Sequence, residues 1–297
     1  MTDQTELRLS YKTCFRFARG HYENFPVASR LLPSSMRPHI AAVYAFARVA
    51  DDFADEGDRT VQERLSLLDR WESCLVQREH VPQTIESFGE LEHPEVAQIF
   101  MALRHTIDQF DLSVDLFTDL LSAFRQDVTV KRYENWVDLL DYCRRSANPV
   151  GRIVLRLAGY NDSILDRQSD CVCSALQITN FLQDFGRDWQ DGRLYVPLEI
   201  QNECGAKLAD LKESLVTPEW RETLESCAKR TEALFLAGRP VCDGVAGSLR
   251  MELRLTWLGG MRILDRVGRK RYDPLSERPV LGVSDFVPLV WRAVVWT

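Results

Sequence analysis

Three aspartates lie close together in the segment YAFARVADDFAD, which spans residues 44–55. On a helical wheel that starts at Tyr44, one sector of about 100° contains the charged side chains Arg48, Asp51, Asp52 and Asp55. Asp51 and Asp55 are one turn apart and can share a divalent cation, while Arg48 can hold an anion beside it. These four residues, called the first seam below, predict metal-assisted binding of an anionic substrate.

A second polar stripe runs through the segment QITNFLQDFGRDWQDGRLYVP at residues 177–197. At helical spacing it covers a sector of roughly 80° and contains Gln177, Asn180, Asp184 and Asp188. The rest of the segment is largely apolar, and burying carboxylates and amides without partners costs several kcal/mol. This stripe, called the second seam, therefore predicts a cation, a cavity or a positively charged neighbour.

Two facing aspartate-rich helices would suit a diphosphate held through Mg²⁺. Mg²⁺ prefers oxygen ligands and is usually held by one or two carboxylates together with substrate phosphates. Such an ion would stabilise departing pyrophosphate and let an allylic or cyclopropylcarbinyl cation form, while apolar helices keep water from the cation.

Each seam alone has a simpler explanation, because a polar strip on a helix can be a solvated face. Both seams together, each in a strongly apolar helix, favour a functional site. A rival of another class is a catalytically silent helical protein that keeps the scaffold and binds a partner or a lipid. Six aligned residues of the metal-ligand type count against that rival.

Helical periodicity accounts for most of the chain, and strand alternation is hardly seen. Helices are expected at about 11–20, 39–57, 60–79, 94–110, 114–126, 133–158, 163–189, 207–214, 218–236, 240–268 and 284–296. No composition break divides the chain. The sequence therefore predicts an all-α fold with a single domain over residues 1–297.

Composition excludes several classes of protein. The 297 residues are 45% hydrophobic, enough for a sizeable core, and the net charge of −7 argues against a nucleic-acid partner. The eight cysteines are scattered without CxxC spacing, so free thiols in a reducing compartment are expected. No window reaches the roughly 18 apolar residues of a membrane span. We expect a cytoplasmic protein, with peripheral contact to the inner membrane face left open.

The two seams and a third segment resemble the squalene and phytoene synthase family of head-to-head prenyltransferases. The matching segments are YAFARVADDFAD at 44–55, DYCRRSANPVG at 141–151 and NFLQDFGRDWQDGRLYVP at 180–197. The resemblance extends over nearly the whole chain, from about Cys14 onward. It implies an isoprenoid-synthase-type helical bundle around a central cavity, an isoprenoid diphosphate substrate and Mg²⁺. The implied metal ligands are Asp51, Asp52, Asp55, Asn180, Asp184 and Asp188.

A finer resemblance, to the bacterial enzymes of the family that form hydroxysqualene, rests on HYENFPVAS at 21–29, SANPVGR at 146–152 and LRLTWLGGMRIL at 253–264. It implies that presqualene diphosphate and water give hydroxysqualene and pyrophosphate without NADPH, in squalene and hopanoid biosynthesis. The alternative is formation of presqualene diphosphate, squalene or phytoene from farnesyl or geranylgeranyl diphosphate. Gln183, where many relatives carry Arg, and the pair Gly259 and Gly260, where they carry bulkier residues, put farnesyl condensation in doubt.

Further candidate residues surround the seams. Candidates for catalysis are His21, Tyr44, Arg48 and Asn148, and candidates for substrate binding are Tyr44, Arg48, Gln177, Gln183, Arg193 and Tyr195. His21 would contact diphosphate, position the attacking water or cap a loop. Arg193 and Tyr195 would close over pyrophosphate, or Arg193 would form an ion pair at a helix end.

Asn148 and Pro149 interrupt a long helical pattern, because proline lacks the backbone N–H that a helix interior uses. A kink there would open room for an isoprenoid chain or orient Asn148 into the cavity, and a packing role explains it equally well. Hand-over of an oily product to other enzymes of the squalene pathway is left open.

Overall fold

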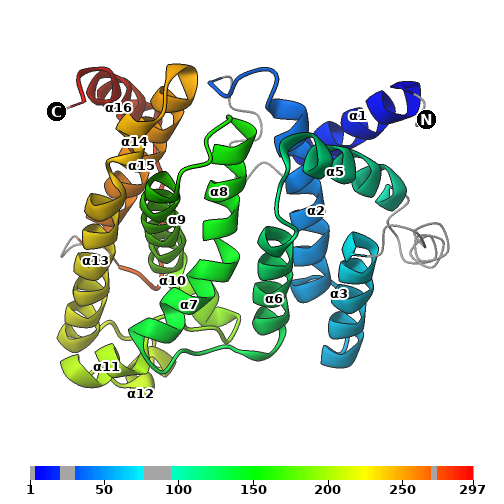
Figure 1. Cartoon of the computed structure of the whole chain (residues 1–297). Coiled ribbons are helices and arrows are strands. Elements are labelled where there is room, and N and C mark those ends of the chain that lie inside the picture. The colour runs from blue at the N-terminus through cyan, green and yellow to red at the C-terminus, as the bar shows by residue number, and fades with distance from the viewer. Residues whose placement is uncertain (1–3, 21–30, 77–94, 269–272, 297) are drawn as a thin grey trace. The chain divides into compact units, whose positions relative to one another are not determined.

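The computed structural model describes residues 4–20, 31–76, 95–268 and 273–296. Over these ranges the regular structure is α-helical, apart from one isolated β-bridge between Arg132 and Leu194 (Figure 1). The prediction of an all-α fold is confirmed. The chain forms two compact units, residues 1–129 with 152–161 and residues 130–151 with 162–297. Each unit is described by itself, and the expectation of a single domain stays a prediction.

The first unit is organised around one buried helix, α2. Its helices are α1 (Gln4–Gly20), α2 (Arg37–Asp55), α3 (Val61–Val76), α5 (Val96–Phe110) and α6 (Asp115–Thr129). Four helices pack on α2, whose alanines and large apolar side chains are buried on nearly every side. The ring of Phe46 lies 5.7 Å from that of Trp71 and 5.7 Å from that of Phe117. The first seam therefore occupies the last turns of a core helix.

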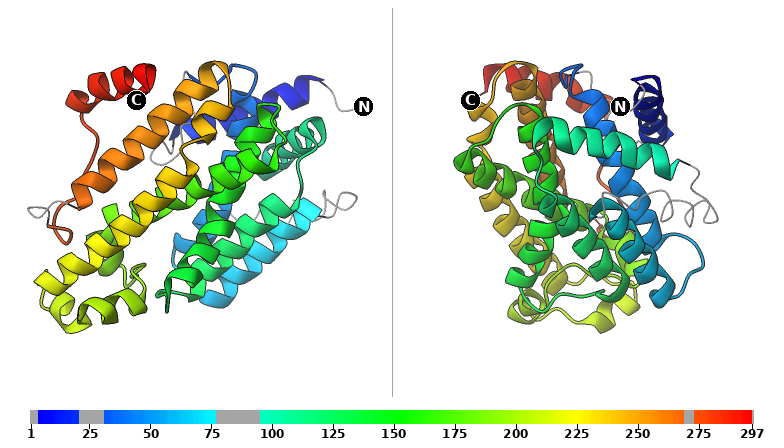
Figure 2. Two further views of the ribbon diagram at one scale, coloured as in Figure 1. Left: turned by 60° about the vertical axis from the view of Figure 1, so that its left-hand side comes forward. Right: turned by 45° about the vertical axis from the view of Figure 1, so that its right-hand side comes forward.

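The second unit is organised around α9 (Figure 1, Figure 2). Its helices are α7 (Trp136–Ser146), α9 (Ser163–Gln183), α10 (Phe185–Gln190), α11 (Leu198–Cys204), α12 (Leu208–Lys212), α13 (Pro218–Gly238), α14 (Val241–Gly244), α15 (Gly247–Val267) and α16 (Val283–Val295), and α8 (Asn148–Leu157) has residues in both units. Helices α13 and α15 pack directly on α9. At Gly260 an added Cβ would lie 2.7 Å from the Leu176 side chain, so this glycine permits the close approach of α15 to α9.

Three helices that the sequence predicts as continuous are each broken in two. The expected helix 133–158 ends at Ser146 and restarts at Asn148, which places Pro149 in the first turn of α8, where proline is tolerated. The expected helix 163–189 is broken at Asp184, and the expected helix 240–268 is broken between Gly244 and Gly247.

The sequence prediction misplaces the start of one helix and misses another. The first helix begins at Gln4 instead of near residue 11, and α11 was not expected. The seven residues of α11 are too few to show a clear helical period.

Two expectations about cellular context can be compared with the structure. All eight cysteines carry free thiols. Burial raises the pKa of the Cys227 thiol to about 12, so this side chain stays protonated as a small apolar core residue. Among the helices that the structure describes, none has both the length and the apolar character needed to cross a membrane.

Candidate active site

Arg48 pairs with two carboxylates of the first seam from the same helix. One Arg48 Nη lies 3.1 Å from Asp51 Oδ2, and the other lies 2.7 Å from Asp52 Oδ1. The second Nη also pairs with Glu56 Oε1. Spacings of three and four residues put Asp51 and Asp52 on the helical face of Arg48, and Glu56 follows the helix as its C-cap. Arg48 therefore neutralises part of a dense acidic cluster.

The first seam contains three carboxylates and one cationic side chain. Burial raises the pKa of Asp52 to about 6, with further repulsion from Glu56 and Asp55 opposing the attraction of Arg48. Burial also raises the pKa of Asp51, to which Asp55 and Asp127 add like charge. A site in which carboxylates are costly to ionise gains stability from an additional cation.

The arrangement fits a divalent metal ion. Carboxylate oxygens of Asp52, Asp55 and Glu56 lie within 4.8 Å of one another, and Mg²⁺ takes such oxygen donors. Asp51 is not part of this group, although it pairs with Arg48 as Asp52 and Glu56 do. Glu56 was not among the predicted ligands, although it directly follows the aspartate motif, and its extended backbone as the C-cap of α2 returns its carboxylate toward Asp52.

The second seam crosses the break between α9 and α10. Asp184 has φ −96° and ψ 11°, outside ideal helix geometry. The i to i−4 bonds nevertheless continue, since Asp184 N–H donates to Asn180 O at 2.8 Å and Asp188 N–H donates to Asp184 O at 2.9 Å. Asn180, Asp184 and Asp188 therefore stay on one side. All four residues of the second seam, including Gln177, are half-buried.

A segment far along the chain supplies a cation that pairs with Asp184 of the second seam. Arg278 binds both carboxylate oxygens of Asp184, one of them from Nη at 3.2 Å. Gln183 Nε2 donates to Pro279 O at 2.6 Å. An added Cβ on Gly186 would lie 2.4 Å from Leu275 O, so the backbone of this segment rests directly on α10. Sequence reasoning missed Arg278, because no local pattern connects it to Asp184.

Arg193 and Tyr195 lie beside the second seam. Arg193 Nε is 3.6 Å from Asp188 Oδ1, and Nη2 is 3.3 Å from Asp191 Oδ2, which is the ion pair considered from the sequence. Tyr195 stacks on Phe181 with ring centroids 3.6 Å apart. The structure thus brings these two residues to the seam and adds an aromatic surface next to it.

The remaining candidates are placed as follows. Asn148 is buried, and its Oδ1 accepts a hydrogen bond from Ser174 Oγ on α9 at 2.9 Å, which is the packing contact considered above. Tyr44 is half-buried one turn before Arg48 on α2. His21 lies outside the described residues. The structure groups each seam with its neighbours within its own unit.

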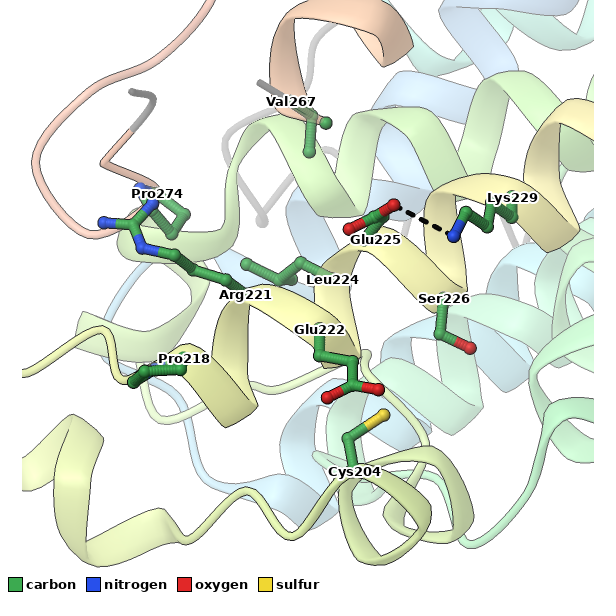
Figure 3. A pocket seen from close by; sticks show the side chains of 11 residues that line it. Cys204, Pro218, Arg221, Glu222, Leu224, Glu225, Ser226, Lys229, Val267 and Pro274 are labelled. Carbon is green, nitrogen blue, oxygen red and sulfur yellow. Dashed lines mark ion pairs between the residues drawn. The ribbon is translucent and has the colours of Figure 1, made fainter. Parts of the chain in front are cut away.

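A hollow of about 730 Å³ elsewhere in the second unit has a different character. Figure 3 shows Arg221, Glu225 and Lys229 projecting from α13 along it, with an ion pair of 2.9 Å between the last two. None of the predicted site residues lines this hollow. Its charged rim is typical of a solvated surface and unsuited to a long apolar substrate.

Comparison with known proteins identifies the family of the chain. Residues 18–285 match the model of squalene/phytoene synthases. The chain belongs to the squalene/phytoene synthase family. The resemblance seen in the sequence is confirmed, and with it membership of a family of enzymes.

Individual relatives align with most of this chain. It is similar to a hydroxysqualene synthase from Rhodopseudomonas palustris, with 36% identity over 291 residues that make up 97% of this chain and 90% of the relative. A hydroxysqualene synthase from Zymomonas mobilis is 40% identical over 266 residues, covering 88% of this chain and 83% of its own.

Solved structures share its fold. The squalene synthase HpnC from Alicyclobacillus acidocaldarius aligns with a TM-score of 0.79 at 38% identity, over 91% of this chain and 97% of the other. A dehydrosqualene synthase bound to a ligand aligns with a TM-score of 0.81 at 25% identity, over 98% of each chain. The expected squalene-synthase type of all-α fold is therefore confirmed.

Proposed function

We propose that the protein is a hydroxysqualene synthase, which converts presqualene diphosphate and water into hydroxysqualene and diphosphate. The observation that carries the proposal is the likeness to hydroxysqualene synthases at 36% and 40% identity over most of the chain. The presence of both seams supports it, because a diphosphate leaving group requires compensation of its negative charge.

We propose that both seams bind Mg²⁺. The ligand set is Asp51, Asp52 and Asp55 in the first seam, and Asn180, Asp184 and Asp188 in the second. The close oxygens of Asp52, Asp55 and Glu56 support this assignment and add Glu56 to the set. Bound there, Mg²⁺ would supply positive charge where the departing diphosphate gathers negative charge.

The protein's own side chains then bind and orient the substrate. Arg48 offers a guanidinium to phosphate oxygens, and Arg193 does so at the second seam, a role suited to the planar arginine fork. Tyr44, Gln177, Gln183 and Tyr195 are proposed to contact the substrate beside them. His21 and Asn148 are proposed to act near the reacting carbon.

The reaction balances without a redox cofactor. The carbon–oxygen bond to diphosphate breaks and its electron pair leaves with the diphosphate. The cyclopropylcarbinyl cation opens as one carbon–carbon bond of its ring breaks, and a water oxygen then forms the new bond to carbon and loses one proton. Apolar side chains such as Phe181 exclude other water molecules from the cation.

A second candidate, squalene formation, has one specific observation in its favour. The relative HpnC, at 38% identity, is described as a squalene synthase. The two reactions differ in whether water or a hydride adds to the carbocation. Gln183, bonded to Pro279 O, supports the first candidate, because it stands where many relatives that condense prenyl diphosphates carry arginine.

Incubation of the purified protein with presqualene diphosphate and Mg²⁺ tests the proposal. We expect hydroxysqualene as the product, in equal amounts with and without NADPH. Squalene that forms only with NADPH would favour the second candidate. In a parallel incubation with farnesyl diphosphate, consumption of that compound but not of presqualene diphosphate would contradict both the proposed substrate and the proposed reaction.

Presqualene diphosphate and hydroxysqualene both carry long apolar chains, which exchange slowly through water. We therefore include peripheral contact with a membrane, and hand-over of the product to other enzymes of the squalene pathway, in the proposed function.

A further inference from the structure

Four polar side chains converge where α1, α2 and α5 of the first unit meet. The hydroxyl oxygen of Tyr11 on α1 lies 3.0 Å from His39 Nδ1 on α2 and 2.8 Å from His105 Nδ1 on α5. Thr106 Oγ1, also on α5, is 2.9 Å from Tyr11 Oη and 2.9 Å from His39 Nδ1. These four residues are called the histidine–tyrosine cluster. Each of the three helices contributes at least one of its polar atoms.

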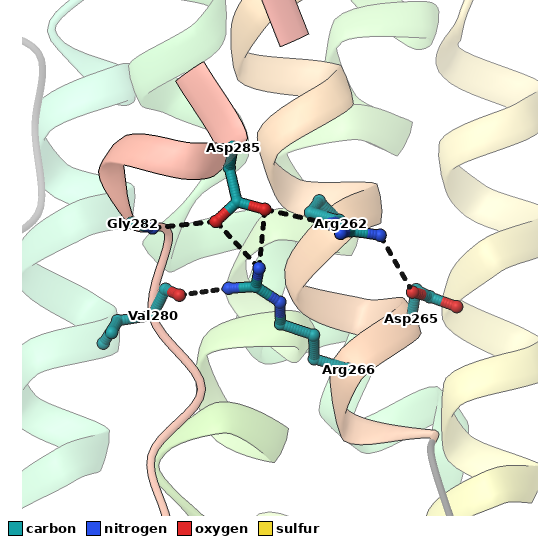
Figure 4. Close-up of polar contacts among 6 residues, drawn as sticks. All are labelled: Arg262, Asp265, Arg266, Val280, Gly282 and Asp285. Carbon is teal, nitrogen blue, oxygen red and sulfur yellow. Dashed lines mark hydrogen bonds and ion pairs between the residues drawn. The ribbon is translucent and has the colours of Figure 1, made fainter. Parts of the chain in front are cut away.

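A buried polar cluster of the second unit, shown in Figure 4, has a different chemistry. The buried carboxylate of Asp285 accepts hydrogen bonds from Arg266 Nη at 2.6 and 2.7 Å and from Arg262 Nε at 3.2 Å. Gly282 N–H donates to the same carboxylate at 2.8 Å. The guanidinium and amide groups there are donors only and cannot ligate a metal. The histidine–tyrosine cluster consists instead of imidazole nitrogens and hydroxyl oxygens, each of which can present a lone pair.

The spacing within the histidine–tyrosine cluster approaches that of a metal site. A tetrahedral Zn²⁺ ion bound at about 2.0–2.1 Å holds its ligand atoms about 3.3 Å apart. The separations of 2.8 to 3.0 Å in the cluster are a few tenths of an ångström smaller. His105 is exposed and can move outward by this amount. A metal ion can therefore replace the hydrogen bonds that join these atoms.

The protonation of the cluster suits a transition metal. Burial lowers the pKa of His39 to about 4, with repulsion from His105 adding to the effect, so the His39 imidazole is neutral, the form that binds metal. Thr106 Oγ1 donates its proton to Ala102 O at 2.9 Å, which leaves its lone pairs for the cluster. Burial raises the pKa of Tyr11 to about 12, so a metal that binds its oxygen must release one proton to solvent.

The cluster can exchange an ion with solvent. His105 is exposed, and Tyr11 lines a hollow of about 430 Å³ on the first unit. Basic side chains of α1 share this hollow, but they are exposed to water, which screens their repulsion of a cation. One of them, Arg16, also lies 3.8 Å from the carboxylate of Glu95.

We propose that the histidine–tyrosine cluster binds a transition-metal ion of the zinc class, with His39 Nδ1, His105 Nδ1 and Tyr11 Oη as ligands and Thr106 Oγ1 at the fourth position. Imidazole nitrogens suit Zn²⁺, whereas Mg²⁺ prefers carboxylate and phosphate oxygens, so the two seams and this cluster select different ions. The bound ion ties α1 and α5 to α2, the helix that ends in the first seam. Such a site is independent of the proposed reaction.

Zinc binding by the full-length protein tests the site. Metal-stripped protein is titrated with Zn²⁺ in competition with a chromogenic chelator, with excess Mg²⁺ present to occupy the seams. We expect one tightly bound Zn²⁺ per chain and a higher midpoint of thermal unfolding, because the ion binds the folded state. His105→Ala and Tyr11→Phe should each weaken binding by about tenfold or more, since loss of an outer-shell partner alone costs that much.

A matched control separates the cluster from adventitious binding by thiols. Cys171 is a free, partly exposed cysteine on α9 in the second unit. Cys171→Ser should bind Zn²⁺ as the wild type does, and circular dichroism should show all three variants folded. With Co²⁺ in place of Zn²⁺, the visible spectrum should show ligand-field bands without a thiolate charge-transfer band in the near ultraviolet.

Three outcomes would overturn the inference. The first is that the wild type binds no stoichiometric Zn²⁺, which would leave the cluster as a hydrogen-bonded anchor alone. The second is undiminished binding in His105→Ala and Tyr11→Phe. The third is a thiolate band with Co²⁺ or weaker binding in Cys171→Ser, which would assign the ion to cysteines. Turnover of presqualene diphosphate is measured separately, so failure of zinc binding is distinguished from failure of the proposed reaction.

Discussion

The two seams carry similar side chains but are built in different ways. The first seam belongs to the end of one continuous helix, and its cation, Arg48, comes from the same helix. The second seam crosses a helix break, and its carboxylate Asp184 is held by Arg278, which is 94 residues away in the chain. The first is therefore set by local spacing, whereas the second depends on the docking of a remote segment.

The helices that carry the seams are also anchored differently. In the first unit His39 of α2 lies in a buried polar cluster, with Nδ1 3.0 Å from Tyr11 Oη and 2.9 Å from Thr106 Oγ1. In the second unit α9 is anchored by the neutral pair of Ser174 and Asn148. The first anchor contains a titratable side chain and the second does not.

The largest effects are expected from removing one charge from either seam. Asp52→Asn and Asp184→Asn should each lower kcat/KM about a thousandfold, because each removes a carboxylate proposed to bind Mg²⁺. Steady-state kinetics with presqualene diphosphate measures the loss. Asp58→Asn, an exposed change three residues beyond the first seam, should stay within about twofold of wild type. Retained activity in either seam variant would remove that seam from the site.

Acid should weaken the anchor of the first unit more than that of the second. Burial lowers the pKa of His39 from 6.5 to about 4, with His105 adding repulsion, so neutral His39 is favoured in the folded state. The contribution of neutral His39 to the free energy of unfolding is complete above pH 6.5. As the pH falls toward 4, this contribution decreases by roughly 2 to 3 kcal/mol.

Urea unfolding across that pH range measures the change. The dependence should be reduced in His39→Gln and kept in Ser174→Ala. Equal acid sensitivity of wild type and His39→Gln would show that His39 is not the titrating group.

The docking of the remote segment can be broken at Gly186. In Gly186→Ala the new methyl would lie 2.4 Å from Leu275 O and 2.8 Å from Pro274 O, so backbone must move. We expect the free energy of unfolding to fall by about 2 kcal/mol, and hydrogen exchange of residues 273–281 to rise. In Gly268→Ala the nearest atom is 3.7 Å away, and stability should change by less than about 0.5 kcal/mol. Equal behaviour of the two variants would refute the close contact.

The smallest effect is expected from the ion pair itself. Arg278 and Asp184 keep 30% and 17% of their side-chain surface exposed, so Arg278→Gln should cost about 1 kcal/mol or less. Arg144→Gln, which breaks a more exposed pair with Asp141, should cost still less. A loss of several kcal/mol in thermal or urea unfolding of Arg278→Gln would show that the second seam depends on this arginine more than on the docked backbone.

Sequence patterns predicted what arises within single helices. The first seam, the core position of α2 and most helix ranges follow from residue spacing alone, because side chains three and four positions apart meet on one face. That rule does not place Glu56, which is the C-cap of α2 with an extended backbone and reaches Asp52 and Asp55 from beyond the helix.

Tertiary contacts account for what the sequence missed. No local pattern predicts the helix break at Asp184. The pairing of Asp184 with Arg278 and the approach of Asp127 to Asp51 each bring together residues that are far apart in the sequence. Gly260 is a similar case, because the side chains that leave no room for a Cβ there, Leu176 and Phe235, lie far from it in the sequence. The assignments of the site residues to substrate and Mg²⁺ stay predictions.

The central claim is that water ends the reaction of presqualene diphosphate at this site. The direct measurement is mass spectrometry of the product formed by purified protein, Mg²⁺ and presqualene diphosphate in water enriched in a heavy oxygen isotope. We predict hydroxysqualene whose hydroxyl carries the heavy isotope at the enrichment of the solvent. A product without the label, or squalene in place of the alcohol, would contradict the account.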